Sequence, residues 1–504
     1  MKKNEMEFAF FCLMYLNWKK QKQYEIDFRN GKIVPGELKM DIFKDSGIFF
    51  GRMKNGELYV GKPAYIDGHV LIVGFPGSGK TMAIVIPTMM SWRGIQIIID
   101  VKGILYSYWE KLNMHTGKKI KLIRLGATND NCCRYDPFAF LRHGGADNLS
   151  GNARNLVLDI MPLLPTVREP VWIQTAQNFL TGAIIYYFDL GCSFNETMIA
   201  VQSKSISETI DLIMDAKNEN AKIYMSKLSD VDRKVIGNIG MELSKLAPLV
   251  NDPAIRDIFS LDDDHDLLDW QELNMVAEPF DVILVFPEAY LDRCEPMILL
   301  IINQLIRSLE QRHERTYSRE SELPPVLVML DEFPRLGKIS AIQNGLATLR
   351  SRGVTFALFV QSLTNLNETY GSEAAKVIID ICQYKVIMGV SDPISQEYFS
   401  KAVGTIESEQ RGISANLDPF SRMFTGFGMN ISETREPIIY PHEFLTLTDV
   451  VVVNPHNGFC RVNKVMVYEH EDTFFKPQLF QNQDTGGSIF MLTQTTCEGS
   501  NYYG

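Results

Sequence analysis

The chain has 504 residues, 45% of them hydrophobic and 22% charged, so it can bury more than one core and is not a disordered protein. Its formal net charge of −11 excludes a protein whose whole surface coats nucleic acid, but is compatible with a local basic groove or the inner wall of a ring. The eight cysteines show no CxxC or Cys/His ligand spacing, which indicates reduced thiols in a cytoplasm and neither a disulfide framework nor a zinc site.

Residues 1–46 form an N-terminal segment with one apolar run, at residues 8–16, between two groups of lysines. A helix that spans a bilayer needs about 20 apolar residues, so this run is too short to cross a membrane alone. No small-residue cleavage site follows it, which argues against a signal peptide. We expect the segment either to lie at a membrane surface or against a membrane partner, or to pack as an amphipathic helix on the domain or on another subunit.

Residues 47–146 begin with two short apolar stretches that predict a hairpin, and they continue into a phosphate-binding loop. An apolar run before the loop predicts a strand, and the apolar residues after it predict the start of a helix. The loop matches G-x-x-x-x-G-K-[ST] and consists of Gly74, Phe75, Pro76, Gly77, Ser78, Gly79, Lys80 and Thr81. The glycines let backbone N–H groups approach phosphates, Lys80 would reach the β- and γ-phosphates, and Thr81 would ligate Mg2+. The motif therefore predicts a bound nucleoside triphosphate.

The second half of the site is expected in residues 276–475, where five apolar residues at 326–330 precede Asp331 and Glu332. A short apolar run of this kind predicts a strand buried on both faces, as in a parallel sheet, and open α/β sheets bind ligands at the carboxyl ends of their strands. Asp331 suits the Mg2+ shell, and Glu332 suits polarising the attacking water. The acidic pair favours hydrolysis over phosphoryl transfer to a small molecule.

The remaining elements predict an α/β protein with a RecA-like nucleotide-binding core and an inserted all-α domain. Further strands are predicted at 95–99, 120–123, 282–286, 355–360 and 385–390. Between the two halves of the site, residues 147–275 show helical periodicity without clear strands, with helices predicted at 152–164, 172–190, 196–216, 223–228, 232–249 and 253–260. The tail at 476–504 is rich in Gln, Thr, Gly and Ser with almost no charge, which predicts a flexible segment.

Several stretches together resemble the coupling proteins of type IV secretion systems, the conjugative ATPases of the TraG/TraD type. The phosphate loop and its flanks are similar to that family's, residues 98–103 resemble its D-P-K-G segment, and residues 135–137 resemble its later D-P turn. The most specific stretches are LDEFPRLGKI at 330–339, LATLRSRG at 346–353 and QSL at 361–363. Residues 169–180 resemble the start of the family's all-α domain. The resemblance covers residues 47–470.

This resemblance implies a ring, a homo-hexamer, that couples ATP hydrolysis to moving relaxase-bound single-stranded DNA, or protein substrates, into a type IV secretion channel. ATP and Mg2+ would be the cofactors. The resemblance also implies that Gln361 senses the γ-phosphate and that Arg350 is an arginine finger for the neighbouring subunit, with Arg352 as the alternative. A strand-end hydrogen bond would explain Gln361 without such a role, and a salt bridge or a solvated helix end would explain either arginine.

Two departures from the family pattern stand out. Val101 replaces the proline of D-P-K-G, and Ile104 follows the glycine where an acidic residue is usual, so the polar contact that this acid makes is in doubt. Most members also begin with two membrane-spanning helices, and this sequence resembles the subset without that anchor or a chain shortened at its N-terminus. We therefore expect a cytoplasmic protein held at the inner face of the cell membrane by partners, including a separate membrane-anchoring subunit.

Three functions remain open at this point. The first is a DNA-coupled motor whose ATPase activity rises with single-stranded DNA. The second is a coupling ATPase for protein effectors only, and the third is a nucleotide-gated substrate receptor with little turnover. Glu332 speaks against the third function, because a protein that only binds nucleotide does not need a carboxylate to activate water.

Overall fold

The computed structural model describes residues 46–52, 58–126, 131–145, 148–163, 169–228, 232–262, 264–275, 278–314, 323–417, 424–454 and 458–469. The predictions made for the N-terminal segment up to residue 45 and for the tail at 476–504 lie outside the described residues. Among the helices within these ranges, none combines the length and the apolar composition needed to cross a membrane.

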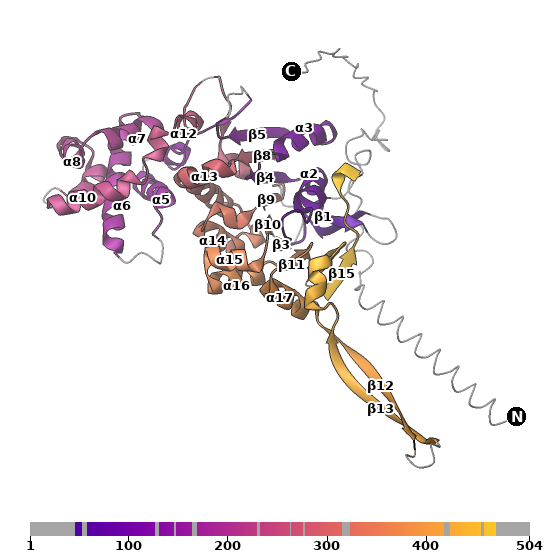
Figure 1. Ribbon diagram of the computed structural model, residues 1–504. Coiled ribbons are helices and arrows are strands. Elements are labelled where there is room, and N and C mark those ends of the chain that lie inside the picture. The colour runs from indigo at the N-terminus through magenta and orange to yellow at the C-terminus, as the bar shows by residue number, and fades with distance from the viewer. Residues whose placement is uncertain are drawn as a thin grey trace, which may run out of the picture.

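A nine-stranded sheet forms the centre of the molecule (Figure 1). Its order is β15 (Gly458–Val462), β14 (Val450–Asn454), β11 (Tyr384–Ile387), β3 (Val70–Val73), β10 (Val354–Val360), β9 (Val326–Leu330), β4 (Ile95–Asp100), β8 (Phe280–Val285) and β5 (Lys119–Arg124). Neighbours from β11 to β5 are parallel, whereas β14 and β15 extend the sheet antiparallel. All predicted strands are confirmed within a few residues.

The parallel strands are buried on both faces, because their alternating side chains enter two separate cores. In β3, Val70 and Ile72 belong to one core and Leu71 and Val73 to the other. The first core also contains the π-helical turn η1 (Thr81–Val85), α2 (Ile86–Ser91), α3 (Leu105–Thr116) and the hairpin of β1 (Gly47–Arg52) and β2 (Leu58–Pro63). The second contains α13 (Leu291–Glu310), α14 (Ser340–Thr348), α15 (Leu363–Tyr370), α16 (Ser372–Ile381) and α17 (Pro393–Val403). The hairpin predicted near residue 47 is confirmed.

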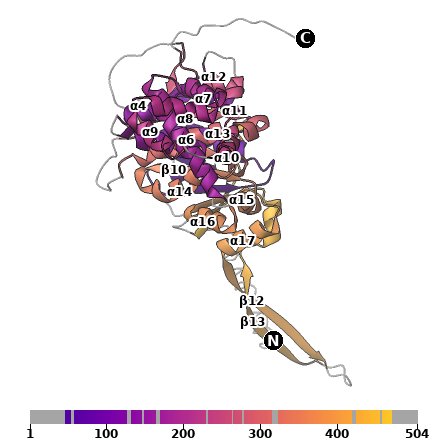
Figure 2. The same ribbon diagram turned by 90° about the vertical axis from the view of Figure 1, so that its left-hand side faces the viewer.

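A group of helices lies beyond the β5 and α13 side of the sheet, as Figures 1 and 2 show. After the short α4 (Ala139–His143), it consists of α5 (Leu149–Ile160), α6 (Pro170–Asp189), α7 (Phe194–Ser203), α8 (Ile206–Asp215), α9 (Glu219–Met225), α10 (Arg233–Ser244), α11 (Pro248–Asn251) and α12 (Pro253–Ile258). The long α6 is largely buried, because α5, α7, α9 and α10 pack around it. Its continuous apolar sequence is typical of a central helix.

Several details of this helical region differ from the sequence predictions, among them the helix predicted at 232–249, which ends at Ser244 and is followed by the separate α11. The prediction of a single helix at 196–216 is wrong, because α7 ends at Ser203 and a second helix, α8, begins at Ile206. Ser205 caps the second helix through a reciprocal hydrogen-bonded box with Glu208, which satisfies the N–H groups at the new helix start. The region also contains one short strand, β7 (Leu267–Leu268), which pairs with β6 (Arg134–Tyr135). The prediction of a block without strands is corrected by this pair.

A long two-stranded hairpin, which the sequence did not predict, projects from the opposite side of the molecule (Figures 1 and 2). It is made of β12 (Thr405–Leu417) and β13 (Phe424–Pro437), paired antiparallel. Its base adjoins α17, and it forms a sheet separate from the nine central strands. The short helices η3 (Trp270–Asn274), η4 (Glu288–Tyr290), η5 (Phe333–Leu336), η6 (Arg350–Arg352), η7 (Pro441–Thr446) and η8 (Val467–Glu469) complete the described elements.

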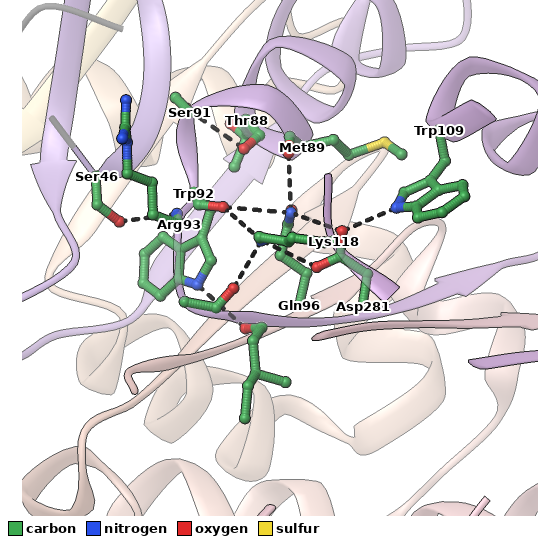
Figure 3. A network of polar contacts seen from close by, with 12 residues as sticks. Ser46, Thr88, Met89, Ser91, Trp92, Arg93, Gln96, Trp109, Lys118 and Asp281 are labelled. Carbon is green, nitrogen blue, oxygen red and sulfur yellow. Dashed lines mark hydrogen bonds and ion pairs between the residues drawn. The ribbon is translucent and has the colours of Figure 1, made fainter. Parts of the chain in front are cut away.

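A buried polar network ties together the amino ends of β4, β5 and β8 (Figure 3). Lys118 Nζ lies 3.0 Å from Asp281 Oδ1 and also donates to the carbonyls of Trp92 and Gly94, each at 2.8 Å. The indole N–H of Trp109 donates to Asp281 Oδ2 at 2.8 Å. The ion pair is almost completely buried, with side-chain exposures of 9% for Lys118 and 1% for Asp281. The network fixes the sheet at the edge opposite the phosphate loop.

Candidate nucleotide-binding site

The phosphate loop leaves β3 at the carboxyl edge of the sheet and is anchored to its neighbours by backbone hydrogen bonds. Gly74 N–H donates to Val360 O at 3.1 Å, and Phe75 N–H donates to Gly389 O at 3.0 Å. Gly77 and Gly79 have φ values of 82° and 92°, a left-handed region that favours glycine. The loop is therefore held between the ends of β10 and β11, with a backbone that other residues would strain.

Lys80 and Thr81 follow the loop and are both nearly buried, at 5% and 9% exposure. The Lys80 ammonium folds back over the loop and donates to Gly74 O at 2.5 Å. Burial lowers the pKa of Lys80, and the negative charge of Glu332 opposes that shift. The Oγ of Ser78 in the same loop is buried and has no hydrogen-bond partner within the described residues. An anion in the loop would satisfy these donors.

The acidic pair stands at the end of β9, as its sequence position predicts. Asp331 is 1% exposed, and neither of its carboxylate oxygens accepts a hydrogen bond from any described residue. Burial raises the pKa of Asp331, and the nearest cation, Lys102 Nζ, lies 3.5 Å from Oδ2. A buried carboxylate with unsatisfied oxygens fits a Mg2+ ligand, because Mg2+ prefers carboxylate and water oxygens.

Glu332 has a strained backbone and well-defined partners. Its φ of 55° makes it the one non-glycine residue with positive φ in the described part of the chain. Such strain costs of order 1–3 kcal/mol and clusters at functional sites. Gln361, directly after β10, donates from Nε2 to Glu332 Oε2 at 3.0 Å. Burial works against ionisation, but this hydrogen bond and the charges of Lys80 and Lys102 outweigh it, so the pKa of Glu332 is lowered. The carboxylate is therefore ionised at neutral pH.

The loop from Phe75 onward, Glu332 and Gln361 line one open pocket of about 440 Å³. Its lining also includes Lys102 and Ile104 after β4, Glu288 and Arg335, and Met466. Asp331 is buried beside this pocket, 3.5 Å from the Lys102 ammonium that also lines it. Met466 belongs to the segment that follows β15, and from the same segment Lys464 Nζ donates to Ser78 O at 2.9 Å. No local sequence pattern assigns this segment to the site, because only the antiparallel extension of the sheet returns it to the loop.

The two arginines proposed as fingers lie outside this pocket. Both belong to η6, which immediately precedes β10, so they stand at the amino edge of the sheet, opposite the phosphate loop. Arg350 is exposed, and its guanidinium has no hydrogen bond or ion pair to another described residue. Arg352 is half-buried and donates to the carbonyl of Arg312, and the Arg312 guanidinium donates from Nε to Arg352 O at 3.4 Å. The guanidinium of Arg350 is therefore available for a contact with another molecule, whereas that of Arg352 is bonded within its own subunit.

The family model described as "Type IV secretory system Conjugative DNA transfer" matches residues 30–486. Protein VirD4 of Agrobacterium fabrum is 24% identical over 417 residues, covering 79% of this chain and 58% of that protein. Conjugal transfer protein TraG of Escherichia coli is 24% identical over 430 residues, covering 80% and 65%. The chain thus spans less than two thirds of the length of these curated relatives.

Solved structures of the plasmid coupling protein TrwB are similar in fold. The complex with a non-hydrolysable ATP analogue superposes with a TM-score of 0.57 at 15% identity, covering 85% of this chain and 97% of that one. The unbound form gives 0.57 at 16% identity, covering 79% and 84%. This likeness confirms the predicted α/β, RecA-like fold with its all-α insertion. Because the family model matches most of the sequence, the chain belongs to the type IV secretory system conjugative DNA transfer family.

Proposed function

We propose that this protein is a coupling ATPase, which uses ATP hydrolysis to recruit relaxase-bound single-stranded DNA, or protein substrates, and to drive them into a type IV secretion channel. The observation that carries the proposal is the convergence of the phosphate loop, Glu332 and Gln361 on one pocket, with the unsatisfied carboxylate of Asp331 buried beside it. Family membership and the fold shared with TrwB, which was solved with an ATP analogue and with ADP and Mg2+, support it.

Each residue in the pocket has a chemical task that its surroundings favour. The loop N–H groups and Lys80 would bind the β- and γ-phosphates, and Thr81 and Asp331 would hold Mg2+. Bound Mg2+ would neutralise the charge that develops on the phosphates. Glu332, ionised and held at the pocket wall, would accept the proton of the attacking water at a carboxylate oxygen. Gln361, bonded to Glu332, would orient that water beside the γ-phosphate.

Completion of the site by a neighbouring subunit would explain where Arg350 lies. Its exposed guanidinium is too far around the sheet to serve the pocket of its own chain, since the two stand at opposite ends of β10. In a ring, here proposed as a homo-hexamer, Arg350 would enter the adjacent pocket and stabilise negative charge in the transition state. Arg352 is the weaker candidate, because its guanidinium is already bonded to Arg312 O.

The proposed partners follow from the family. They are single-stranded DNA with its relaxase or secreted protein substrates, the components of the secretion channel, and a separate membrane-anchoring subunit that would hold the protein at the inner face of the cell membrane. The helical insertion presents apolar side chains to solvent, including Ile223 at 68% exposure and Met241 at 69%. Such side chains would suit a protein contact, so this region is a candidate surface for substrate or adaptor.

The test is steady-state ATP hydrolysis by the purified chain over a range of protein concentrations, with and without single-stranded DNA. A DNA motor built as a ring predicts turnover that rises cooperatively with protein concentration and increases with DNA. Turnover that does not change with DNA would indicate that the transported substrate is a protein. The absence of turnover above that of Glu332→Gln at every concentration would contradict the ATPase proposal itself.

A further inference from the structure

Lys102 is the one cation in the described part of the chain that contacts both carboxylates of the acidic pair, and the proposed hydrolysis assigns it no role. Its Nζ lies 3.0 Å from Glu332 Oε1 and 3.5 Å from Asp331 Oδ2. These residues are 230 positions apart in the sequence and meet because β4 and β9 are adjacent in the sheet. The contact is therefore a product of the fold.

The backbone around Lys102 is fixed by the side chain of Asp100. Asp100 Oδ1 accepts hydrogen bonds from the N–H groups of Lys102 and Gly103, at 3.0 and 2.8 Å, and Oδ2 accepts from Leu105 N–H at 2.8 Å. Gly103 adopts a φ of 72°, which lets the chain turn sharply into α3. This turn holds the Lys102 Cα beside the end of β9, while the side chain remains 40% exposed and free to move into solvent.

Lys102 occupies the acidic pair in a way that conflicts with the proposed chemistry. In this arrangement Glu332 Oε1 accepts a hydrogen bond from Lys102 and Oε2 accepts one from Gln361, so the carboxylate is less basic toward water than it would be without the ammonium. Asp331 is 2% exposed in its side chain and cannot follow Lys102 outward. A divalent cation on Asp331 would lie a few ångströms from the Lys102 ammonium, and their like charges would repel strongly inside a half-buried pocket.

We propose that Lys102 is a resident counter-ion of the acidic pair, which competes with the divalent cation and withdraws when the metal enters with the nucleotide. Its withdrawal releases Oε1 of Glu332, so the base becomes free when the pocket is loaded. Lys102 is thus a positioning residue that couples loading to readiness for hydrolysis. This inference rests on the proposed function, because it takes Asp331 as the metal ligand.

The direct test measures binding of a divalent cation without nucleotide, so it does not depend on hydrolysis, DNA or partners. Mn2+ is the probe, since it takes the same carboxylate and water ligands as Mg2+ and its free concentration is measurable by electron paramagnetic resonance. Lys102→Met removes the competing charge and leaves a side chain of similar length. We expect the variant to bind Mn2+ about two- to fivefold more tightly than the wild type, which is the effect of removing a partly exposed ion pair.

Three controls make the outcome specific. Lys102→Arg keeps the positive charge and should bind Mn2+ as weakly as the wild type. Lys401→Met removes a lysine that is 81% exposed on α17 and should also leave Mn2+ binding unchanged. The thermal midpoint of Lys102→Met should be lower than that of the wild type in chelator and should recover when Mn2+ is added, because the metal replaces the lost counter-ion.

Equal Mn2+ affinity in the wild type and in Lys102→Met, with both proteins folded by near-ultraviolet circular dichroism, would overturn the proposal. If Lys102→Met does not fold, Lys102→Gln is the second variant, with the same expectation. The combination of Lys102→Met with Asp331→Asn separates the two inferences. Loss of the gained Mn2+ site would support both, whereas a gained site that survives would show that the metal binds elsewhere and would contradict the assignment of Asp331.

Discussion

The ion pair between Lys118 and Asp281 provides a quantitative test of the packing at the amino edge of the sheet. Asp281→Ala would leave the Lys118 ammonium, 9% exposed, with only the carbonyls of Trp92 and Gly94 as acceptors. It would also leave the Trp109 indole N–H without its acceptor. Removing one partner of a buried pair costs about 3–5 kcal/mol of unfolding free energy, because the remaining charge stays buried and uncompensated.

The size of this loss depends on the charge that remains and not on the carboxylate itself. Burial lowers the pKa of Lys118, and Asp281 opposes that shift, so each group depends on the other for its ionised form. Replacing both partners, with Lys118→Met and Asp281→Leu, removes the two charges together. We expect this double variant to unfold within about 2 kcal/mol of the wild type, since apolar replacements of a buried pair are often neutral.

Urea denaturation followed by tryptophan fluorescence is the appropriate assay, because Trp109 belongs to the network and Trp92 lies against it. Asp211→Ala, which removes an exposed carboxylate on α8, is the matched control and should change the unfolding free energy by less than about 0.5 kcal/mol. A loss below about 1 kcal/mol in Asp281→Ala, or a double variant no more stable than the single one, would refute the reasoning.

Three further predictions concern the site and the helical insertion. Lys80→Ala should abolish binding of an ATP analogue in a calorimetric titration while the far-ultraviolet circular dichroism is retained, and wild-type affinity would contradict the role of Lys80. Arg350→Ala should lower kcat roughly 1,000-fold or more, whereas Arg352→Ala should mainly lower stability. Mixing the Arg350→Ala and Glu332→Gln proteins should restore turnover, since a mixed ring contains some intact sites. No restoration would contradict action in trans. Burial raises the pKa of Asp159 to about 6 from 3.8, so the folded state holds a proton that the unfolded state has lost, and stability falls as pH rises from 4 to 6. Urea titrations should show wild type losing about 2 kcal/mol relative to Asp159→Asn across that interval, and an unchanged difference would refute the shift.

The parts of the site that the sequence could predict are those written in local patterns. The phosphate loop is one continuous segment and needs glycines at 77 and 79, where φ is positive, so its sequence motif is sufficient to identify it. Asp331, Glu332 and Gln361 each follow an apolar strand directly, and parallel strands place their carboxyl ends together. The structure brings the loop, Glu332 and Gln361 to one pocket and buries Asp331 beside it, while their chemical roles stay predictions.

The parts that the sequence could not predict depend on which strands are neighbours. Lys102 was visible only as part of a D-x-K-G stretch, and its contact with Glu332 exists because β4 lies beside β9. Lys464 reaches the phosphate loop across 386 positions through the antiparallel extension of the sheet. The start of a new helix at Ser205, in contrast, has a local sequence signal, because a serine three residues before a glutamate is typical of a helix N-terminus. The continuous apolar periodicity of residues 196–216 nevertheless predicts one helix.

The central claim, that Glu332 is the base of an ATPase, is tested most directly by phosphate release from ATP under single-turnover conditions. Glu332→Gln should bind ATP as the wild type does, but its rate of phosphate release should be lower by roughly 100-fold or more, because the amide cannot accept the proton of the attacking water. Glu288→Gln is the matched control, since Glu288 lines the same pocket but is 58% exposed and paired with Arg335, and it should keep wild-type rates. Phosphate release from Glu332→Gln at the wild-type rate would contradict the account.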